Sequence, residues 1–480
     1  MPDVMQSPRT TAVPPKGLSN FAGKRVHLIG IGGSGMSALG SLLLDCGAIV
    51  SGSDQTPSRH LDNLMRRGAK ISFSHDAQNL PDGDAIVVHS SAIREDNPEI
   101  VAARAKGFDV LKFAQMLGRL MDSSVGVAIS GTHGKSTTTG MVSWCLRSAG
   151  VDPSYLVGAC VPQLGGGGFA GKGRHFVVEA CEFDRSFLNY HPHVGAILNI
   201  DEDHLDCYRD LDDIVSAFSA FAGNVPTDGV VVINGDDPDA LKAAIASKAP
   251  VETFGLQSEK SFWSGTNVSV SEGRHSLDVL RDGQPIARMN VSLPGLHNAC
   301  NALGAFAVLC HCGLEPREIA RHIESFAGVD RRLMKKAHIA GVTVVDDYAH
   351  HPAEIRASLL ALREFYQPER LICVFQPHQH SRTRFLLKEF ACALSTCDKV
   401  LLPDIYFVRD SESERDYISS EDLAAQVRLQ GGSAKYLGSF ENVQTHLNSR
   451  LRRGDLLVTM GAGNVWEIAD ETVRWLGINR

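Results

Sequence analysis

The stretch VGVAISGTHGKSTTT, at Val125–Thr139, leads from an apolar β-branched strand through a glycine loop into a helical pattern. The loop ends in Gly-Lys-Ser, as a P-loop does, but Ile129 stands where the usual spacing has its first glycine, so the loop is shortened. Backbone N–H groups of such loops cradle phosphates, while Lys135 would reach the β- and γ-phosphates and the Ser136 hydroxyl would coordinate Mg²⁺. The stretch therefore predicts a nucleoside triphosphate site with Mg²⁺.

A second glycine loop lies about a hundred residues earlier in the chain. GIGGSG, at Gly30–Gly35, follows the predicted strand Arg25–Gly30 and opens a helix over Met36–Leu44, with Asp54 further on. By itself this pattern indicates an NAD-dependent oxidoreductase, with Asp54 on the ribose hydroxyls. However, N–H groups and the positive end of a helix dipole suit any diphosphate, including that of a UDP-sugar. Both hypotheses stay open on this motif alone.

Strand and helix patterns alternate in three blocks, which predicts an α/β protein of three domains with parallel sheets. We expect a disordered tail over residues 1–22, a Rossmann-like domain over 23–121, a P-loop ATPase-type domain over 122–330 and a second Rossmann-like domain over 331–480. The predicted strands include His175–Glu179 and Val194–Ile200 in the middle block. The run Gly165–Gly168 is interpreted as a glycine loop.

The composition of the 480 residues excludes several classes of protein. A net charge of −8, with 47 basic and 55 acidic residues, gives no basic stripe for nucleic acid. The first 20 residues lack the apolar core of a signal peptide, and no run approaches the length of a membrane span. The 11 scattered cysteines are typical of reduced thiols. We expect a soluble cytoplasmic protein with no membrane insertion, either a monomer or a homodimer.

Acidic residues and a histidine end two neighbouring predicted strands. Glu179 ends one, and Asp201-Glu202-Asp203-His204 follows the other. Ligands gather beyond the carboxyl ends of parallel strands, and hard oxygen ligands there suit Mg²⁺. We therefore expect Glu179, His204 and Ser136 to be metal ligands.

Several motifs in a fixed order resemble those of the Mur ligases, over about Lys24 to Trp466. The motifs are HLIGIGGSGMSALG (His27–Gly40), GTHGKSTTT (Gly131–Thr139), DHLD (Asp203–Asp206), HNACN (His297–Asn301), GVDRR (Gly328–Arg332), DDYAHHPAE (Asp346–Glu354), FQPHQHSRTR (Phe375–Arg384) and MGAG (Met460–Gly463). The resemblance implies three α/β domains that bind UDP, ATP and the incoming amino acid in turn. Within the family, the chain most resembles the branch that joins L-alanine to UDP-N-acetylmuramic acid. That branch uses ATP and Mg²⁺ and forms an acyl phosphate.

The resemblance also implies roles for individual residues. The implied ATP-binding residues are Gly131, Thr132, His133, Gly134, Lys135, Ser136, Thr137, His297, Asn298, Asn301 and Arg332. The implied UDP-sugar-binding residues are Gly32, Gly33, Gly35, Met36, Ser37 and Asp54. The implied amino-acid site is His350, His351, Arg382 and Arg384, and the implied catalytic residues are Lys135, His204, His351 and Arg382.

Some of these assignments have alternatives. Asn298 is equally explained as a helix N-cap, and Arg331-Arg332 as a solvated pair rather than hinge arginines. A zinc site formed by His350 and His351 with His378 and His380 is a less favoured hypothesis than an amino-acid site, because the arginines nearby favour anions.

The chain departs from the family pattern after Glu179. EACEFDRSFL, at Glu179–Leu188, has Cys181 where an acid is usual and adds Arg185, which puts local substrate contacts in doubt. No lysine lies between Asp206 and Phe221, where sister ligases carry a carbamylated lysine. That absence resembles the alanine-adding branch. The alternative functions are a murein-peptide ligase, an NAD-dependent oxidoreductase and a P-loop switch without ligase chemistry.

Overall fold

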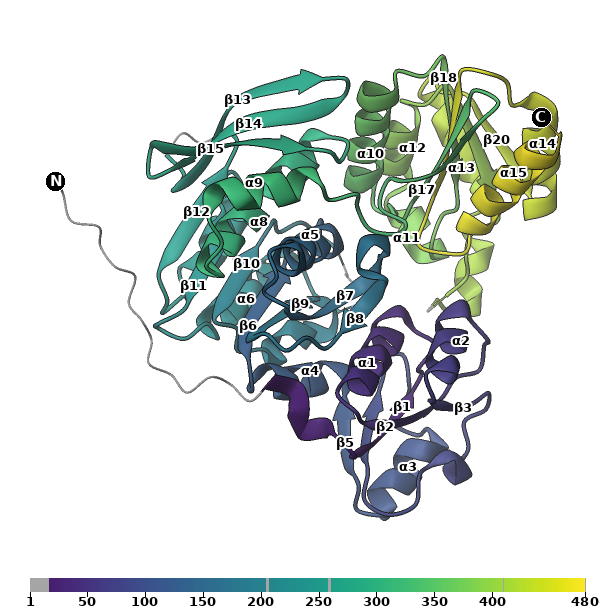
Figure 1. Ribbon diagram of the computed structural model, residues 1–480. Helices are drawn as coiled ribbons and strands as arrows, with labels where there is room; N and C mark the ends of the chain where they lie inside the picture. Colours follow the sequence, from purple (N-terminus) through teal and green to yellow (C-terminus); the bar gives the residue numbers. More distant parts are fainter. Residues whose placement is uncertain (1–16, 204–206, 258–259, 409, 480) are drawn as a thin grey trace.

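The computed structural model describes residues 17–203, 207–257, 260–408 and 410–479, and these form three α/β lobes (Figure 1). The chain builds the lobes in order, with the middle lobe between the other two (Figure 1). Each lobe contains one sheet, so the predicted fold class is confirmed. The predicted domain boundaries stay predictions.

The first lobe is a parallel sheet in the order β3-β2-β1-β4-β5. Its strands are β1 Arg25–Ile29, β2 Ile49–Ser53, β3 Lys70–Ser72, β4 Ile86–His89 and β5 Asp109–Lys112, and its helices are η1 Gly17–Phe21, α1 Ser34–Asp45, α2 Arg59–Arg66, η2 Ala77–Asn79, α3 Pro98–Ala105 and α4 Phe113–Met121. Four of the five residues of β1 are buried, as expected for a strand covered on both faces.

The middle lobe is a sheet of ten strands in the order β15-β14-β13-β12-β11-β10-β6-β9-β7-β8. Its strands are β6 Val125–Ser130, β7 Ser154–Val161, β8 Gly166–Phe169, β9 His175–Glu179, β10 Val194–Ile197, β11 Val230–Asn234, β12 Val251–Gly255, β13 Trp263–Ser271, β14 Arg274–Arg281 and β15 Gln284–Val291. Its helices are α5 Lys135–Ser148, η3 Pro162–Leu164, η4 Phe183–Asn189, α6 Leu211–Gly223, α7 Pro238–Ala244, α8 Leu296–His311 and α9 Pro316–Glu324.

The sheets are parallel as expected, except at their edges. β13, β14 and β15 form an antiparallel ribbon, joined by turns at Glu272-Gly273 and Asp282-Gly283. All four turn residues have positive φ, between 48° and 73°. Two-residue turns of this kind match the twist of paired strands, and Asp-Gly is a strong signal for one. β16 of the third lobe is antiparallel as well.

The predicted glycine loop at Gly165–Gly168 is also wrong, because Gly166–Phe169 form the edge strand β8. This strand packs on α1 of the first lobe. A Cβ on Gly168 would lie 2.0 Å from the carbonyl oxygen of Ala38, so glycine is needed for this close approach.

The third lobe is a sheet in the order β16-β17-β21-β18-β19-β20. Its strands are β16 Met334–Ile339, β17 Val342–Asp347, β18 Arg370–Phe375, β19 Lys399–Pro403, β20 Ala434–Gly438 and β21 Asp455–Met460. Its helices are α10 Pro352–Tyr366, α11 His380–Phe385, α12 Leu387–Leu394, η5 Glu412–Asp416, α13 Ser420–Leu429, α14 Phe440–Arg450 and α15 Trp466–Asn479.

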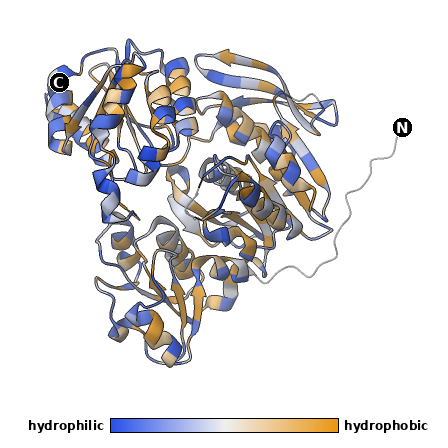
Figure 2. Cartoon of the chain, turned by 180° about the vertical axis from the view of Figure 1, so that it is seen from behind, coloured by the Kyte–Doolittle hydropathy of each residue, from blue (hydrophilic) through white to orange (hydrophobic). Residues whose placement is uncertain are grey.

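Hydrophobic residues concentrate in the strands and in the helix faces against them (Figure 2). One core cluster joins the first two lobes, since it contains Leu28 and Leu117 together with Phe187 and Phe218. The third lobe instead has clusters of its own. No helix among the described residues has both the length and the apolar composition that a membrane crossing requires.

Candidate active site

The P-loop lies between β6 and α5, and Lys135 is folded back over it. Gly131 and Gly134 have φ of 142° and 82°, which only glycine adopts without strain. Lys135 Nζ donates to the carbonyl oxygens of Gly131 and Thr132 at 2.6 and 2.9 Å and pairs with Glu182 at 2.9 Å. Burial alone would lower the pKa of Lys135, but Glu182 and its neighbours outweigh it and raise that pKa, so the cation is retained.

Ser136 and Glu179 bring oxygen ligands together at the mouth of the P-loop. The Ser136 hydroxyl donates to Glu179 Oε1 at 3.0 Å, and Glu179 Oε2 accepts the Gly158 backbone N–H at 2.7 Å. A hydroxyl and a carboxylate side by side suit Mg²⁺, which takes few protein oxygens alongside phosphates and water. The predicted ligand His204 lies outside the described residues.

Two asparagines support the P-loop, and the sequence patterns predicted only one of them. Asn199 Oδ1 accepts the His133 backbone N–H at 2.7 Å, and its amide donates back to the His133 carbonyl at 3.0 Å. The sequence patterns missed Asn199, although it is the polar residue near the end of VGAILNI. Asn301 was predicted to bind ATP, and it lies against the loop, where a Cβ on Gly134 would come within 2.7 Å of its Oδ1.

The remaining P-loop residues lie beside these groups. Thr132 Oγ1 accepts the Asp201 backbone N–H at 2.9 Å. Thr137 is buried in the first turn of α5. The predicted ATP-binding residues from Gly131 to Thr137 are therefore contiguous around one loop.

His133 connects the P-loop to the third lobe. Its Nδ1 lies 3.0 Å from Glu354 Oε1 on α10, and its Nε2 lies 3.3 Å from Asp201 Oδ2. Its ring stacks on that of His351, with centroids 5.6 Å apart. Burial would lower the pKa of His133, but the hydrogen bonds to Asp201 and Glu354 outweigh it and raise the pKa to about 9.

The third lobe brings some of its predicted residues to this place and not others. Arg382 pairs with Asp203 across the lobes at 3.1 Å. His350 is within 6.2 Å of His378, ring to ring, and burial lowers its pKa to about 4. Arg384 instead pairs with Glu414 at 3.2 Å within its own lobe, so the structure does not bring it to the P-loop.

The hinge arginines are not a solvated pair. Arg331 has φ of 60°, and its guanidinium bonds Asp346 at 3.2 Å and the Gly461 carbonyl at 2.6 Å. Arg332 lies over the ring of Tyr348, 4.9 Å from its centroid. Both side chains are therefore fixed where the middle lobe joins the third.

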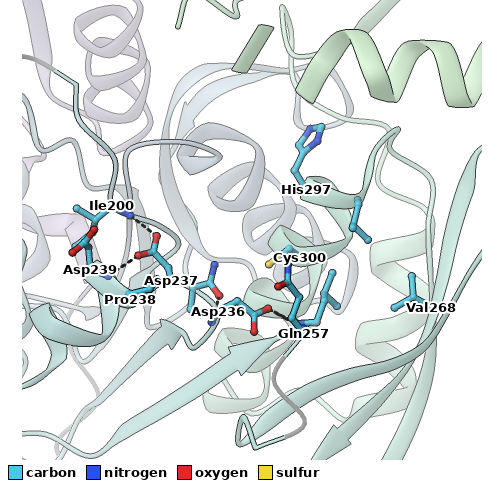
Figure 3. A pocket seen from close by; sticks show the side chains of 12 residues that line it. Ile200, Asp236, Asp237, Pro238, Asp239, Gln257, Val268, His297 and Cys300 are labelled. Carbon is cyan, nitrogen blue, oxygen red and sulfur yellow. Dashed lines mark hydrogen bonds between the residues drawn. The ribbon is translucent and has the colours of Figure 1, made fainter. Parts of the chain in front are cut away.

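A pocket of about 730 Å³ opens beside the start of α8 (Figure 3). It is lined by Ile200, Asn234, Asp236, Asp237, Pro238, Asp239, Leu256, Gln257, Val268, Leu296, His297 and Cys300. Of the three residues predicted from HNACN, only His297 lines this pocket.

Asn298 has a structural role at this point. It is buried, and its amide donates to the Pro294 carbonyl at 2.8 Å. The N-cap of α8 is Gly295, so the N-cap alternative for Asn298 is wrong, although the residue still fixes the approach to the helix.

The first glycine loop is closed by its own acidic residue. Asp54 Oδ2 accepts the Gly32 backbone N–H at 2.8 Å, and Oδ1 accepts that of Thr56 at 3.1 Å. Gly33 is the N-cap of α1, and Gly35 packs against Phe113.

The predicted residues Met36 and Ser37 complete this loop. Both are buried, and the Ser37 hydroxyl donates to the Ser34 carbonyl at 3.0 Å. The predicted UDP-sugar residues therefore form one continuous feature at the strand-to-helix turn.

The departure after Glu179 leaves the P-loop contacts intact. Burial raises the pKa of Cys181 to about 12, so it is a neutral thiol where the family has an acid. Arg185 pairs with Asp213 at 2.8 Å and lies over Tyr208. The added positive charge is thus directed at α6.

Three models of Mur ligase domains match the sequence of this chain. The sequence model of the Mur ligase family catalytic domain matches residues 25–124, that of the Mur ligase middle domain matches 129–309, and that of the Mur ligase glutamate ligase domain matches 331–463. The chain belongs to the Mur ligase family.

Curated Mur ligases match over nearly their whole length. A UDP-N-acetylmuramate–L-alanine ligase of Caldanaerobacter subterraneus is 40% identical over 93% of this chain and 97% of its own. That of Acetivibrio thermocellus is 40% identical over 93% of this chain and 95% of its own.

Solved Mur ligases have the same three-lobed architecture. The crystal structure of the UDP-N-acetylmuramate-alanine ligase MurC of Thermotoga maritima superposes with a TM-score of 0.80 at 27% identity, covering 95% of this chain and all of the other. A murein peptide ligase of Psychrobacter arcticus, at 24% identity and a TM-score of 0.71, covers 95% of this chain and 99% of its own, and shares the fold. The resemblance seen in the motifs is confirmed, while the residue roles stay predictions.

Proposed function

We infer that the chain is an ATP-dependent ligase that joins L-alanine to UDP-N-acetylmuramic acid. The observation that carries this is the 40% identity, over 93% of the chain, to ligases named for that reaction. The P-loop supports it, since Lys135, Ser136 and Glu179 form one cation and oxygen cluster. The reaction belongs to the synthesis of peptidoglycan precursors. We propose that it takes place in the cytoplasm and that the enzyme is a monomer or a homodimer.

We propose that ATP lies along the P-loop, with its base in the pocket beside α8. His297 and Cys300 line that pocket, and α8 also supplies Asn301 against Gly134 of the loop. Burial lowers the pKa of His297 to about 4, so a neutral ring faces the base. One helix would thus position both ends of the nucleotide.

We propose that Ser136 and Glu179 hold Mg²⁺, with His204 as a further ligand. The ion would neutralise charge on the phosphoryl oxygens. Lys135 pairs with Glu182 beside the P-loop. When ATP is bound, Lys135 would exchange this carboxylate for the transferred phosphoryl group. Charge neutralisation by fixed cations is the main contribution a protein makes to phosphoryl transfer.

The first step would be attack of the substrate carboxylate on the γ-phosphate of ATP, which gives an acyl phosphate and ADP. The amine of L-alanine then attacks the acyl carbon, and the tetrahedral intermediate collapses to the amide and inorganic phosphate. Positioning supplies much of the rate, because well-oriented reactants gain about 7–11 kcal/mol in favourable cases. Closure by the third lobe would exclude water from the acyl phosphate.

The third lobe would complete the amino-acid site. Arg382 is the strongest candidate for the alanine carboxylate, since its guanidinium already holds the Asp203 carboxylate across the lobes. Burial lowers the pKa of His351, so its ring is neutral and able to accept the proton of the alanine ammonium. We no longer expect Arg384 to contact substrate, because it is held by Glu414.

The first lobe would bind the UDP portion. Its glycine loop offers backbone N–H groups at the N-terminus of α1, and these suit a diphosphate. Membership of a ligase family removes the reason to expect NAD there.

A test of the proposed function is release of inorganic phosphate. We expect release only when ATP, Mg²⁺, UDP-N-acetylmuramic acid and L-alanine are all present. Substitution of glycine or L-serine for L-alanine would measure selectivity. Release that does not depend on the sugar nucleotide would contradict the proposal.

A further inference from the structure

Three side chains from two lobes converge on one point beside the P-loop. His133 and Asp201 come from the middle lobe and His351 from the third, and one ligand atom of each lies within 4.8 Å of the others. Among the described ranges, this is the one group of three or more such residues that is so close. The zinc quartet weighed from the sequence, of His350, His351, His378 and His380, is not assembled.

The spacing of two of these atoms fits a tetrahedral transition metal. His133 Nε2 and Asp201 Oδ2 are 3.3 Å apart. Zn–N and Zn–O bonds of about 2.0–2.2 Å place two tetrahedral ligands roughly 3.3–3.5 Å apart. An ion could therefore replace the hydrogen bond between them with little movement of either side chain.

The third ring has an unused nitrogen. His351 Nδ1 is buried and makes no hydrogen bond within the described structure. The His351 ring is also stacked against that of His133. A buried nitrogen without a partner is costly, and a metal ion that binds the ring through Nδ1 would satisfy it.

The surroundings supply the outer contact that metal-binding histidines have. His133 Nδ1 lies 3.0 Å from Glu354 Oε1, so a carboxylate orients the ring from the side opposite Nε2. Glu354 is itself fixed, because its Oε2 accepts the His350 backbone N–H at 3.1 Å. Such carboxylate–histidine–metal arrangements are usual in zinc sites.

We propose that His133, Asp201 and His351 form a binding site for a zinc-like transition metal ion, which ties the P-loop to the third lobe. The ion displaces the proton that His133 shares with Asp201. It also occupies the ring that accepts the alanine proton in the proposed function, so a bound ion inhibits that reaction. The site has two imidazoles and one carboxylate with a fourth position open, which is the ligand set of an open zinc site. It differs from the oxygen cluster of Ser136 and Glu179, which suits Mg²⁺.

Co²⁺ added to the metal-free protein is the probe, because tetrahedral Co²⁺ gives an intense visible spectrum. We expect a tetrahedral nitrogen and oxygen spectrum at one equivalent, reversed by Zn²⁺. The variants His351→Gln and Asp201→Asn each remove one ligand, so a loss of affinity of at least tenfold is expected for both. Glu354→Gln should weaken binding by about 10–100-fold, as outer-sphere changes do.

His446→Gln is the matched control, since His446 lies on α14 at the far side of the third lobe and should bind Co²⁺ as the parent does. Cys392 is an exposed thiol, and binding there would show as a sulfur-to-cobalt band. Circular dichroism of the metal-free variants separates misfolding from loss of a ligand. Because His351→Gln and Asp201→Asn change different lobes, loss of Co²⁺ affinity in both would not be explained by misfolding of one lobe.

Equal Co²⁺ affinity in the parent, His351→Gln and Asp201→Asn would overturn the proposal, as would a spectrum of thiolate or octahedral type. These measurements use no ligase turnover, so they succeed or fail independently of the proposed function. A raised melting temperature with Zn²⁺ in the parent but not in His351→Gln would add that the ion joins the lobes.

Discussion

The two glycine loops differ in what closes them. In the first lobe, Asp54 accepts the N–H of Gly32 at 2.8 Å, so an acid from the same sheet holds the loop. In the middle lobe, Lys135 covers the loop and pairs with Glu182, while Ser136 bonds Glu179. Both loops follow a buried parallel strand and open a helix.

In the proposed function both loops bind phosphate groups, and the residues around each loop decide the chemistry. A loop closed by a carboxylate offers N–H groups alone, which suits binding of a diphosphate that does not react. A loop with a buried lysine and oxygen ligands can stabilise charge that moves during phosphoryl transfer. The middle loop also contacts the third lobe, through the pair of His133 with Glu354.

The largest effect is expected from removal of the lysine that distinguishes the loops. Lys135→Ala should reduce turnover by more than about a hundredfold, because loss of a phosphate-facing charge costs at least about 3 kcal/mol in the transition state. Steady-state phosphate release measures this, with the exposed Lys248→Ala as the control. Activity within tenfold of the parent would remove Lys135 from the mechanism.

A smaller effect is expected where the third lobe meets the middle loop. Arg382→Ala should raise the Km for alanine by about 10–100-fold, since a charge-assisted hydrogen bond contributes roughly 1.5–3 kcal/mol. ATP affinity, measured by calorimetry, should change little. Arg384→Ala is the matched control, because Arg384 is held by Glu414. If alanine Km and kcat are unchanged in Arg382→Ala, this arginine serves only the ion pair with Asp203.

The glycine loop of the first lobe can be altered by mutation without a change in the P-loop. A Cβ on Gly32 would lie 2.7 Å from Asp54 Oδ2, whereas one on Gly33 would meet only the Gly30 carbonyl at 3.6 Å. Gly32→Ala should weaken binding of UDP-N-acetylmuramic acid by about tenfold, because the clash breaks the part-buried bond to Asp54, which contributes roughly 1–3 kcal/mol to the loop geometry. Gly33→Ala adds a Cβ without a clash in the free protein, so a loss of affinity in this variant would report contact with the ligand itself. If calorimetry gives both variants the affinity of the parent, the loop does not bind the diphosphate.

The smallest effect is expected at Asp54 itself. Asp54→Asn keeps an oxygen that can accept from Gly32, so affinity for the sugar nucleotide should fall by no more than a few fold. A much larger loss, with the melting temperature unchanged, would return Asp54 to the predicted role of contacting ribose. Titration with UDP and with 2′-deoxy-UDP, which lacks one ribose hydroxyl, separates a ribose contact from closure of the loop.

Local sequence patterns predicted the elements that repeat a simple rule. The strand His175–Glu179 begins and ends as expected, because runs of buried apolar residues define parallel strands. β8 was missed because its glycines look like a loop, although they are required by the close approach of Ala38.

The site was predictable where its residues lie at the ends of adjacent parallel strands. Lys135, Ser136 and Glu179 meet as expected because they end adjacent strands or follow them. The pairs His133–Glu354 and Arg382–Asp203 join residues more than 170 positions apart, so no local pattern relates them. The pair of Arg384 with Glu414, 30 positions apart, is likewise seen only in the fold.

The most direct test of the central claim is mass spectrometry of the product when L-alanine and a murein tripeptide compete at equal concentration, with ATP, Mg²⁺ and UDP-N-acetylmuramic acid. The account predicts the alanyl amide of the sugar nucleotide, with one phosphate released for each amide formed. A tripeptide adduct as the main product would assign the chain to peptide recycling. No amide at all, together with tight binding of NAD, would contradict the ligase function itself.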